Sequence, residues 1–344
     1  MTDHSTWTPL HARIHRTLRS RHLLERNQTI LVAVSGGQDS LCLIKLLLDL
    51  QQKWEWQLGI AHCDHRWRSD SQANANYVKQ IATNWHLPFY CYTAKQPPKS
   101  EAAARQWRYQ AFSAIAQTNG YNCIVTGHTA SDRAETLLYN LIRGSGADGL
   151  QALTWRRSID SGLLLVRPLL DVTRTETAQF CQDMQLTVWE DATNQDLKYA
   201  RNRIRQELLP YLQTHFNPQV ESALAQTAEL LQAEVEYLEQ AAHQLRLRAQ
   251  TEASRAGGKS NLSPLASHPS SLQLNRHLLQ TAPLALQRRV IRQWLHQALS
   301  CTPSFEQIEK LTALITAPSG SQTDPFPGGA IAQVEKDWIW LKPG

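Results

Sequence analysis

The residues with the clearest chemical capacity form one short run, Ser35-Gly36-Gly37-Gln38-Asp39-Ser40. Two adjacent glycines allow a tight turn that brings backbone N–H groups against a ligand. An apolar run precedes them and leucines at helical spacing follow, so the turn would lie at a helix N-terminus, which attracts phosphate. The two serines add hydroxyl donors, and Asp39 adds a carboxylate that a hydrated Mg²⁺ can use. The run predicts a phosphate site in which all six residues bind and Asp39 is the metal ligand.

This loop differs from two common nucleotide-binding loops. No lysine follows the glycines at the position that G-x-x-x-x-G-K-[ST] requires, which disfavours transfer of a γ-phosphate. G-x-G-x-x-G is also missing, which disfavours dinucleotide binding. The alternative interpretation is an ordinary glycine-containing turn of an α/β domain.

A second group of chemically capable residues follows a strand that ends at Gly127. If a helix begins at His128, then His128, Asp132 and Glu135 share one face at i, i+4 and i+7. Two carboxylates and an imidazole form an acidic pocket whose natural guest is a cation, either Mg²⁺ or the ammonium of an amino acid. The alternative is a solvated first helical turn whose acids favour the helix dipole.

Arginines on two further helices could meet phosphate. Arg105 lies at helical spacing from Glu101 and Arg108, so it either forms an ion pair within its helix or presents a guanidinium to a nucleotide. Arg201 and Arg205 share a helical face, a pattern that suits a phosphate backbone.

Composition limits the class of protein. The chain has 344 residues, 42% of them hydrophobic and 19% charged, which is typical of a globular protein of two or three domains. Its net charge of +5 is weak support for a nucleic-acid partner. Scattered cysteines without CxxC indicate reduced thiols and a cytoplasmic protein. We expect no signal peptide and no membrane span, because no apolar run reaches the required length.

Apolar segments alternate with helical patterns through residue 210. The expected strands are 30–34, 57–65, 88–92, 121–128 and 163–166. This alternation predicts an α/β fold with a Rossmann-like parallel sheet for residues 1–215. The ends of these strands would gather the candidate residues at one edge of the sheet.

Residues 216–344 predict a second, mainly helical domain. It begins with a long helix from residue 220 to 248, followed by a loose segment at 249–271 and a terminal hairpin at 328–341. A helix at 284–298 carries a basic face that either contacts RNA or packs with a solvated rim.

Taken together, the motifs resemble those of the tRNA(Ile)-lysidine synthases, members of the PP-loop ATP pyrophosphatase superfamily. Several PP-loop families share the first block, whereas the later blocks in this order are specific to this one. The resemblance leads us to expect that the additional C-terminal domain of longer members is missing. The matching blocks are SGGQDS (35–40), AHCDHRWR (61–68), EAAARQWRY (101–109), TGHTASDRAETLLYNLIRGSGADGL (126–150), RPLL (167–170) and EDATNQDLKYARNRIRQELLP (190–210).

The resemblance implies a ligase that uses ATP and Mg²⁺. The wobble cytidine of tRNA(Ile) with a CAU anticodon would attack the α-phosphate through O2, and free lysine would then displace AMP at C2. Arg105 would neutralise charge on the α-phosphate, and His128 would steady the adenylate. Asp132 and Glu135 would hold the lysine, and Arg201 and Arg205 would grip the tRNA. The oligomeric state stays open, with a homodimer as one option.

Three alternatives remain for comparison. Another PP-loop enzyme, a tRNA thiolase, would need a CxxC motif or a catalytic cysteine pair, and this chain has no CxxC. A GMP or NAD synthetase would need a glutaminase or an ammonia channel. A non-catalytic RNA- or nucleotide-binding module would explain the loop, but not Asp39, Arg105 and the acidic helix together.

Overall fold

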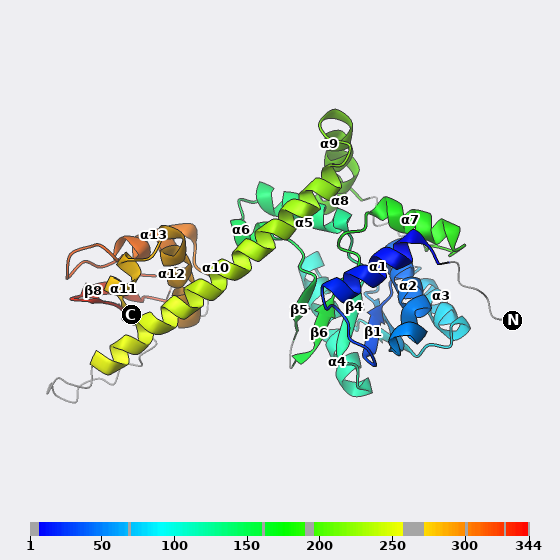
Figure 1. The fold of residues 1–344 in the computed structure, drawn as a ribbon, viewed down its shortest axis with the longest axis horizontal. Helices are drawn as coiled ribbons and strands as arrows, with labels where there is room; N and C mark the ends of the chain where they lie inside the picture. The colour runs from blue at the N-terminus through cyan, green and yellow to red at the C-terminus, as the bar shows by residue number, and fades with distance from the viewer. Residues whose placement is uncertain are drawn as a thin grey trace. The chain divides into compact units, whose positions relative to one another are not determined.

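A computed structural model of the chain describes residues 7–67, 70–159, 162–189, 196–256, 272–299, 302–326 and 328–342. The chain forms two compact units, Met1–Gln232 and Ala233–Gly344, which are coloured blue to green and yellow to red in Figure 1. The residues 190–195 of the last matching block lie outside the described residues, as do 257–271 of the expected loose segment.

The described part of the first unit contains a six-stranded sheet in the order β3-β2-β1-β4-β6-β5. All neighbouring strands are parallel except β5 and β6, which are antiparallel. The predicted parallel α/β fold is therefore confirmed, and β5 is an added edge strand. The strands are β1 (Thr29–Ala33), β2 (Gln57–Asp64), β3 (Phe89–Thr93), β4 (Cys123–Thr126), β5 (Arg156–Ser158) and β6 (Leu164–Val166).

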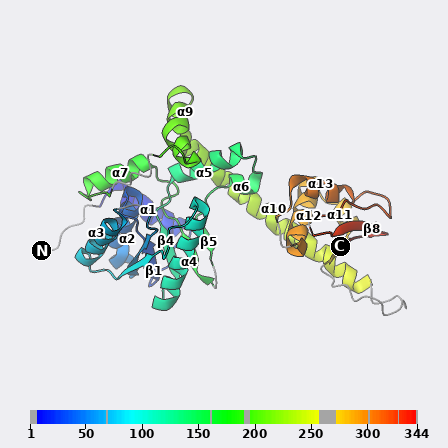
Figure 2. The same ribbon diagram turned by 180° about the vertical axis from the view of Figure 1, so that it is seen from behind.

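Helices cover both faces of this sheet, as Figures 1 and 2 show from opposite sides. In β1, Ile30 and Val32 point to a core shared with α1, α2, α3 and α7, and Leu31 points to a second core shared with α4. All three side chains are fully buried, and each contributes about 1.5–3 kcal/mol. The helices of this unit are α1 (Pro9–Ser20), α2 (Gln38–Trp54), α3 (Ser71–Asn84), α4 (Glu101–Asn119), α5 (Ala130–Ile142), α6 (Ala147–Leu150), α7 (Arg174–Asp183), α8 (Ala200–Arg203), the π-helix η3 (Ile204–Leu208), α9 (Leu209–His215) and the start of α10 (Val220–Ala256).

The strand order places a crevice beside β1. The chain runs from β1 outward to β2 and β3, then returns to the other side of β1 with β4. In an open α/β sheet, such a reversal leaves a crevice at the carboxyl ends of the two central strands, where ligands bind. The Ser35–Ser40 run follows β1 and His128 follows β4, so both candidate groups lie at this crevice.

The first turns of α10 are anchored to the first unit. Glu229 accepts hydrogen bonds from the buried Arg133 at 2.6 Å and from the indole of Trp155 at 2.6 Å, and it pairs with Arg21 at 2.5 Å. The two units therefore divide inside α10, whereas the sequence predicts a boundary before it, between residues 215 and 216.

The second unit combines helices with a small antiparallel sheet in the order β7-β9-β8 among its described residues. Trp294 is fully buried in its core. The expected terminal hairpin is confirmed as β8 and β9. The basic face of α12 is paired with acids, because Arg288 contacts Glu309 and both Arg289 and Arg292 contact Glu239. The elements are β7 (Gln273–Asn275), α11 (Arg276–Gln280), α12 (Leu284–Leu299), α13 (Phe305–Ala313), β8 (Ile331–Glu335) and β9 (Trp338–Lys342).

Within the described ranges, no helix combines the length and the apolar character needed to cross a bilayer.

Candidate active site

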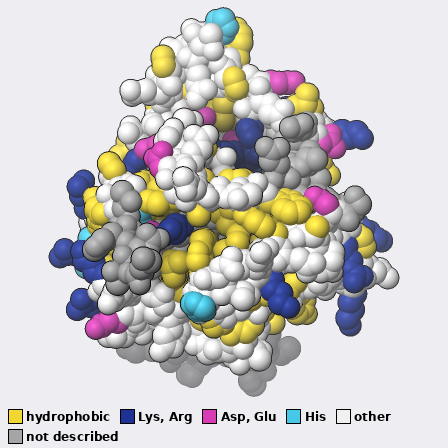
Figure 3. All heavy atoms as spheres, turned by 90° about the vertical axis from the view of Figure 1, so that its right-hand side faces the viewer, with side chains coloured by type: hydrophobic (Ala, Val, Ile, Leu, Met, Phe, Trp, Pro, Cys, Tyr) yellow, Lys and Arg dark blue, Asp and Glu magenta, His cyan; other side chains and the backbone are white. Residues whose placement is uncertain are grey.

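A cleft of about 740 Å³ opens at the carboxyl ends of β1, β2 and β4. Its walls include the side chains of Asp39 from α2, Arg105 from α4, His128 after β4, Asp132 from α5 and Arg174 from α7. Figure 3 shows the face turned toward the N-terminal side, where most Lys and Arg side chains lie at the periphery and a few lie recessed in the upper half. Positive charge on this face is therefore not gathered into one broad patch.

The Ser35–Ser40 loop joins β1 to α2 as a tight turn. The Ser40 hydroxyl accepts a hydrogen bond from the Ser35 amide at 3.1 Å and donates to the Gly37 carbonyl at 2.9 Å. Gly37 is the N-cap of α2 and has no side chain to cover the free amides of the first helical turn. These amides therefore remain available to an anion.

Two glycines are required here, Gly36 by its backbone conformation and Gly127 by close approach. Gly36 has a φ of +91°, and a Cβ there would lie 2.6 Å from the Asn74 side-chain oxygen. Gly127, at the end of β4, faces the same loop from the neighbouring strand. A Cβ on Gly127 would lie 2.8 Å from the backbone oxygen of Asp39, closer than real Cβ contacts allow.

We therefore expect Gly127→Ala to push the start of α2 out of place. Affinity for the non-hydrolysable analogue α,β-methylene-ATP, measured by calorimetry, should fall about tenfold or more, because a displaced donor set loses charge-assisted hydrogen bonds. Gly146→Ala is the matched control, since a Cβ there meets nothing within 4 Å. Equal affinities of the two variants would show that this close approach does not position the loop.

Guanidinium groups form one wall of the cleft. Arg105 and Arg108 on α4 both line it, and Arg105 stacks over Tyr109 with 5.3 Å between the guanidinium carbon and the ring centroid. Among the described residues, Arg105 forms no ion pair with a carboxylate. Burial lowers the pKa of Arg105, and the neighbouring Arg201 and Arg108 lower it further. This wall is therefore short of negative charge and suits a phosphate.

His128 follows β4 and lines the cleft next to this wall. Its Nδ1 lies 2.8 Å from the hydroxyl of Thr126. Burial lowers the pKa of His128 to about 3, although the nearby Asp132 acts in the opposite direction. The imidazole is therefore neutral at physiological pH and serves as a hydrogen-bonding group rather than as a cation.

This partly buried, neutral imidazole should make the fold sensitive to acid. The unfolded chain binds a proton on His128 near pH 6.5 and the folded chain only near pH 3, so stability is complete above 6.5 and falls as the pH drops. We expect the free energy of unfolding in urea to fall between pH 7 and pH 5. In His128→Asn the slope should be shallower by up to about 1.4 kcal/mol per pH unit. Parallel slopes of the two proteins would contradict a neutral His128 in the folded state.

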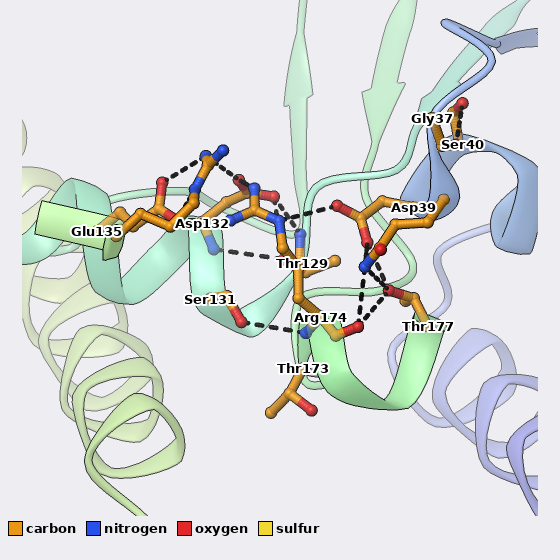
Figure 4. A network of polar contacts seen from close by, with 12 residues as sticks. Gly37, Asp39, Ser40, Thr129, Ser131, Asp132, Glu135, Thr173, Arg174 and Thr177 are labelled. Carbon is orange, nitrogen blue, oxygen red and sulfur yellow. Dashed lines mark hydrogen bonds and ion pairs between the residues drawn. The ribbon is translucent and has the colours of Figure 1, made fainter. Parts of the chain in front are cut away.

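Arg174, the first residue of α7, joins three acidic side chains at or just behind the cleft wall. Its Nε donates to Asp39 at 3.2 Å, its Nη2 to Asp132 at 2.5 Å and its Nη1 to Glu135 at 2.6 Å. Figure 4 shows these contacts radiating from one guanidinium between α2 and α5. The arginine thus connects the Ser35–Ser40 loop to α5.

Asp132 and Glu135 also have partners of their own. The second oxygen of Asp132 accepts from the amide and hydroxyl of Thr129 at 2.8 and 3.0 Å, which caps α5. Arg205 binds both oxygens of Glu135, at 2.7 and 2.9 Å. Burial opposes ionisation of Asp132, but Arg174 and the other donors outweigh it and lower its pKa to about 2.

Known proteins match both halves of the chain. A family model described as the PP-loop domain matches residues 8–212, and one described as the TilS substrate binding domain matches residues 274–340. A tRNA(Ile)-lysidine synthase of Nostoc sp. is 69% identical over 340 residues, covering 98% of each chain. This chain belongs to the tRNA(Ile)-lysidine synthase family. 

More distant relatives agree with this assignment. A tRNA(Ile)-lysidine synthase of Synechocystis sp. is 50% identical and covers 97% of each chain. The chloroplastic tRNA(Ile)-lysidine synthase of Zygnema circumcarinatum is 35% identical and covers 90% of this chain and 81% of that protein. A solved structure of the U34-tRNA thiolase NcsA from Methanococcus maripaludis, with a [4Fe-4S] cluster, shares the fold. Its TM-score is 0.55 at 12% identity, covering 65% of this chain and 78% of that one.

The structure of this lysidine synthase family member brings most of the predicted site residues to one cleft. Asp39, Arg105, His128 and Asp132 line it, as do Ser35, Gly37, Gln38 and Ser40. Gln38 turns its amide away toward α7, where it donates to the Arg174 carbonyl at 2.9 Å. Glu135 lies behind the wall with only 3% of its side chain exposed, so it reaches the cleft through the two arginines.

The sequence did not predict the roles of Arg174, which lines the cleft, and Thr177, which contacts Asp39. Thr177 donates a short 2.5 Å hydrogen bond to Asp39. One signal was available for Arg174, because a cation at the first position of a helix opposes the helix dipole and is an unfavourable choice without a nearby anion. The contact of Arg205 with tRNA stays a prediction. In the structure its guanidinium binds Glu135 from the π-helix η3, a local distortion common at functional sites.

Proposed function

We propose that this chain ligates lysine to C2 of the wobble cytidine of tRNA(Ile) with a CAU anticodon. ATP first loads AMP onto O2 of the cytidine and releases pyrophosphate. The ε-amine of free lysine then attacks C2 and AMP leaves, giving lysidine. The observation that carries the proposal is the single cleft where an amide-rich loop, a wall of guanidiniums and an acidic pocket meet.

The Ser35–Ser40 loop would hold the phosphates of ATP. The free amides at the start of α2 and the hydroxyls of Ser35 and Ser40 are hydrogen-bond donors. Arg105, which has no acidic partner among the described residues, would take the charge that builds up on the α-phosphate. Preorganised donors of this kind stabilise a transition state by several kcal/mol.

Asp39 is the residue that would hold Mg²⁺. Its side chain is 18% exposed and lines the cleft next to the loop amides. Mg²⁺ commonly uses one or two carboxylates together with phosphate oxygens and water, so one carboxylate beside a phosphate site fits. Burial raises the pKa of Asp39, with Arg174 opposing the rise, so an adjacent cation favours its ionised form. When bound, the metal would neutralise phosphate charge.

The acidic pocket would receive lysine. Asp132 is ionised at physiological pH, since its pKa is about 2, and it can attract the lysine ammonium. The amine must lose a proton before it attacks, and a carboxylate of this pocket is the nearest acceptor. His128 is neutral and would hold the adenylated cytidine in place by hydrogen bonding. An unpaired anticodon loop can splay its base into such a cleft.

Incorporation of labelled lysine tests the proposal. The protein is incubated with ATP, Mg²⁺, labelled lysine and a CAU-anticodon tRNA(Ile) transcript. We expect label in the tRNA and one pyrophosphate released for each lysine bound. A matched transcript with a CAU anticodon in the tRNA(Met) body is the control for substrate choice. Pyrophosphate release that needs neither tRNA nor lysine would redirect the assignment.

The alternative, a tRNA thiolase, has less support. Cys63 lines the cleft, but burial raises its pKa to about 12, which keeps the thiol protonated and poorly nucleophilic. Sulfur incorporation into tRNA in place of lysine would favour this alternative.

A further inference from the structure

We infer that, without nucleotide, the guanidinium of Arg174 occupies the position that the ammonium of the substrate lysine takes. Lysine must replace this guanidinium in order to bind, and binding of the nucleotide releases the guanidinium. The inference rests on the proposed function, because it assumes that Asp132 and Glu135 receive lysine. We call these two carboxylates the amine site. Arg174 would then be a positioning residue that makes lysine binding depend on ATP.

The first support is the position of the guanidinium. Two of its nitrogens lie 2.5 Å from Asp132 and 2.6 Å from Glu135, at oxygens where an ammonium would form charge-assisted hydrogen bonds of about 2.7–2.9 Å. Asp132 has its other oxygen on the Thr129 cap, and both oxygens of Glu135 also accept from Arg205. Little acceptor capacity is therefore left for lysine while Arg174 stays in place (Figure 4).

The second support is that the amine site is held without Arg174. The Thr129 cap fixes Asp132, and the two-pronged contact of Arg205 fixes Glu135. Removal of the Arg174 guanidinium would leave both carboxylates oriented, with negative charge uncovered. An ammonium would fit such a preformed site better than a disordered one.

The third support is the link to Asp39. The third hydrogen bond of the Arg174 guanidinium goes to the Asp39 carboxylate at 3.2 Å. A change at the proposed nucleotide site would therefore alter the contacts of this guanidinium directly. A cation placed on Asp39 with ATP would compete for that oxygen, and the phosphates would attract the guanidinium toward the loop. Three carboxylates face two guanidiniums here, so the negative charge exceeds the resident positive charge by only one, and the attraction for lysine is weak while Arg174 stays in place.

The backbone of Arg174 is fixed while its side chain can move. Its amide donates to Ser131 at 3.1 Å, and its carbonyl accepts from Gln38 at 2.9 Å and from Thr177 at 3.0 Å. The side chain is 24% exposed and lines the cleft. A change of rotamer is therefore sufficient, without movement of α7.

Calorimetric titration with lysine tests the inference on the full chain. In the wild type, Mg²⁺ with α,β-methylene-ATP should tighten lysine binding by about tenfold or more, in the usual range for linked sites. Arg174→Ala should bind lysine without nucleotide about 10–100-fold more tightly than the wild type does, and the nucleotide analogue should add little. A purely structural arginine would give the opposite result, since its loss would weaken lysine binding.

Arg13→Ala is the matched control, because Arg13 pairs with Asp171 and Glu176 at the start of α7 but lies outside the cleft. Its lysine affinity should equal that of the wild type. Unchanged or weaker lysine binding by folded Arg174→Ala overturns the inference. If Arg174→Ala does not fold, the wild-type titrations test the inference by themselves. A wild-type lysine affinity that is the same with and without the nucleotide analogue then overturns the inference. If the wild type also forms no lysidine, the proposed function has failed instead.

Discussion

Replacing Asp39 by alanine should reduce pyrophosphate release from ATP at least about 10³-fold, because the change removes the carboxylate proposed for Mg²⁺ from a site built to stabilise phosphate charge. It also removes one partner of Arg174 and the acceptor of the Thr177 hydroxyl, so the loop loses two of its contacts with α7. The measurement is the single-turnover rate of pyrophosphate formation with tRNA present and lysine absent. Adenylation should fall to background.

Asp39→Asn separates charge from packing. The amide has the same size and can still accept from Thr177, but it carries no charge for Mg²⁺. We expect the asparagine variant to fold with a thermal midpoint close to that of the wild type and still to fail in adenylation. Wild-type adenylation by either variant would show that Asp39 has neither proposed role.

Replacing Glu135 by alanine should affect the two half-reactions differently. Adenylation of the tRNA should be partly retained, because Glu135 lies behind the cleft wall, away from the Ser35–Ser40 loop. Transfer of lysine should be lost by at least about a hundredfold, because Arg174 and Arg205 lose their shared acceptor and the amine site loses one of its two carboxylates. Adenylated tRNA should therefore accumulate, which gel mobility or mass spectrometry can detect.

Glu135→Gln serves as the conservative control. It keeps the shape of the side chain but loses the charge, so its lysine transfer should also be slow, and a high lysine concentration should partly restore it. Loss of adenylation and lysine transfer to the same extent would assign Glu135 a structural role. Normal lysine transfer would remove it from the site.

Local sequence patterns predicted the framework of the fold well. The continuous apolar run of β1 arises because its side chains are buried on both faces of the sheet, and Gly36 marks a turn whose φ of +91° other residues rarely adopt. β5 was not predicted, since Arg156, Arg157 and Ser158 are exposed at the sheet edge and show no apolar pattern.

The contacts across the cleft could not be predicted in the same way. Arg174 is separated from its partners Asp39, Asp132 and Glu135 by 135, 42 and 39 residues. Local sequence periodicity does not predict such long-range contacts. They form because the strand order of the sheet returns the chain to β1. The sequence placed Asp132 and Glu135 on one helix correctly. It could not show that two arginines already neutralise most of their charge.

A pulse-chase experiment tests the central claim most directly. Wild-type protein is mixed with CAU-anticodon tRNA(Ile), Mg²⁺ and ATP labelled at the α-phosphate, and excess unlabelled ATP and lysine are added later. We predict that label first becomes covalently attached to the wobble cytidine, and that lysine then releases it as AMP and leaves lysidine. Label that never reaches the tRNA, or that stays on it while lysidine forms at another step, would contradict the account.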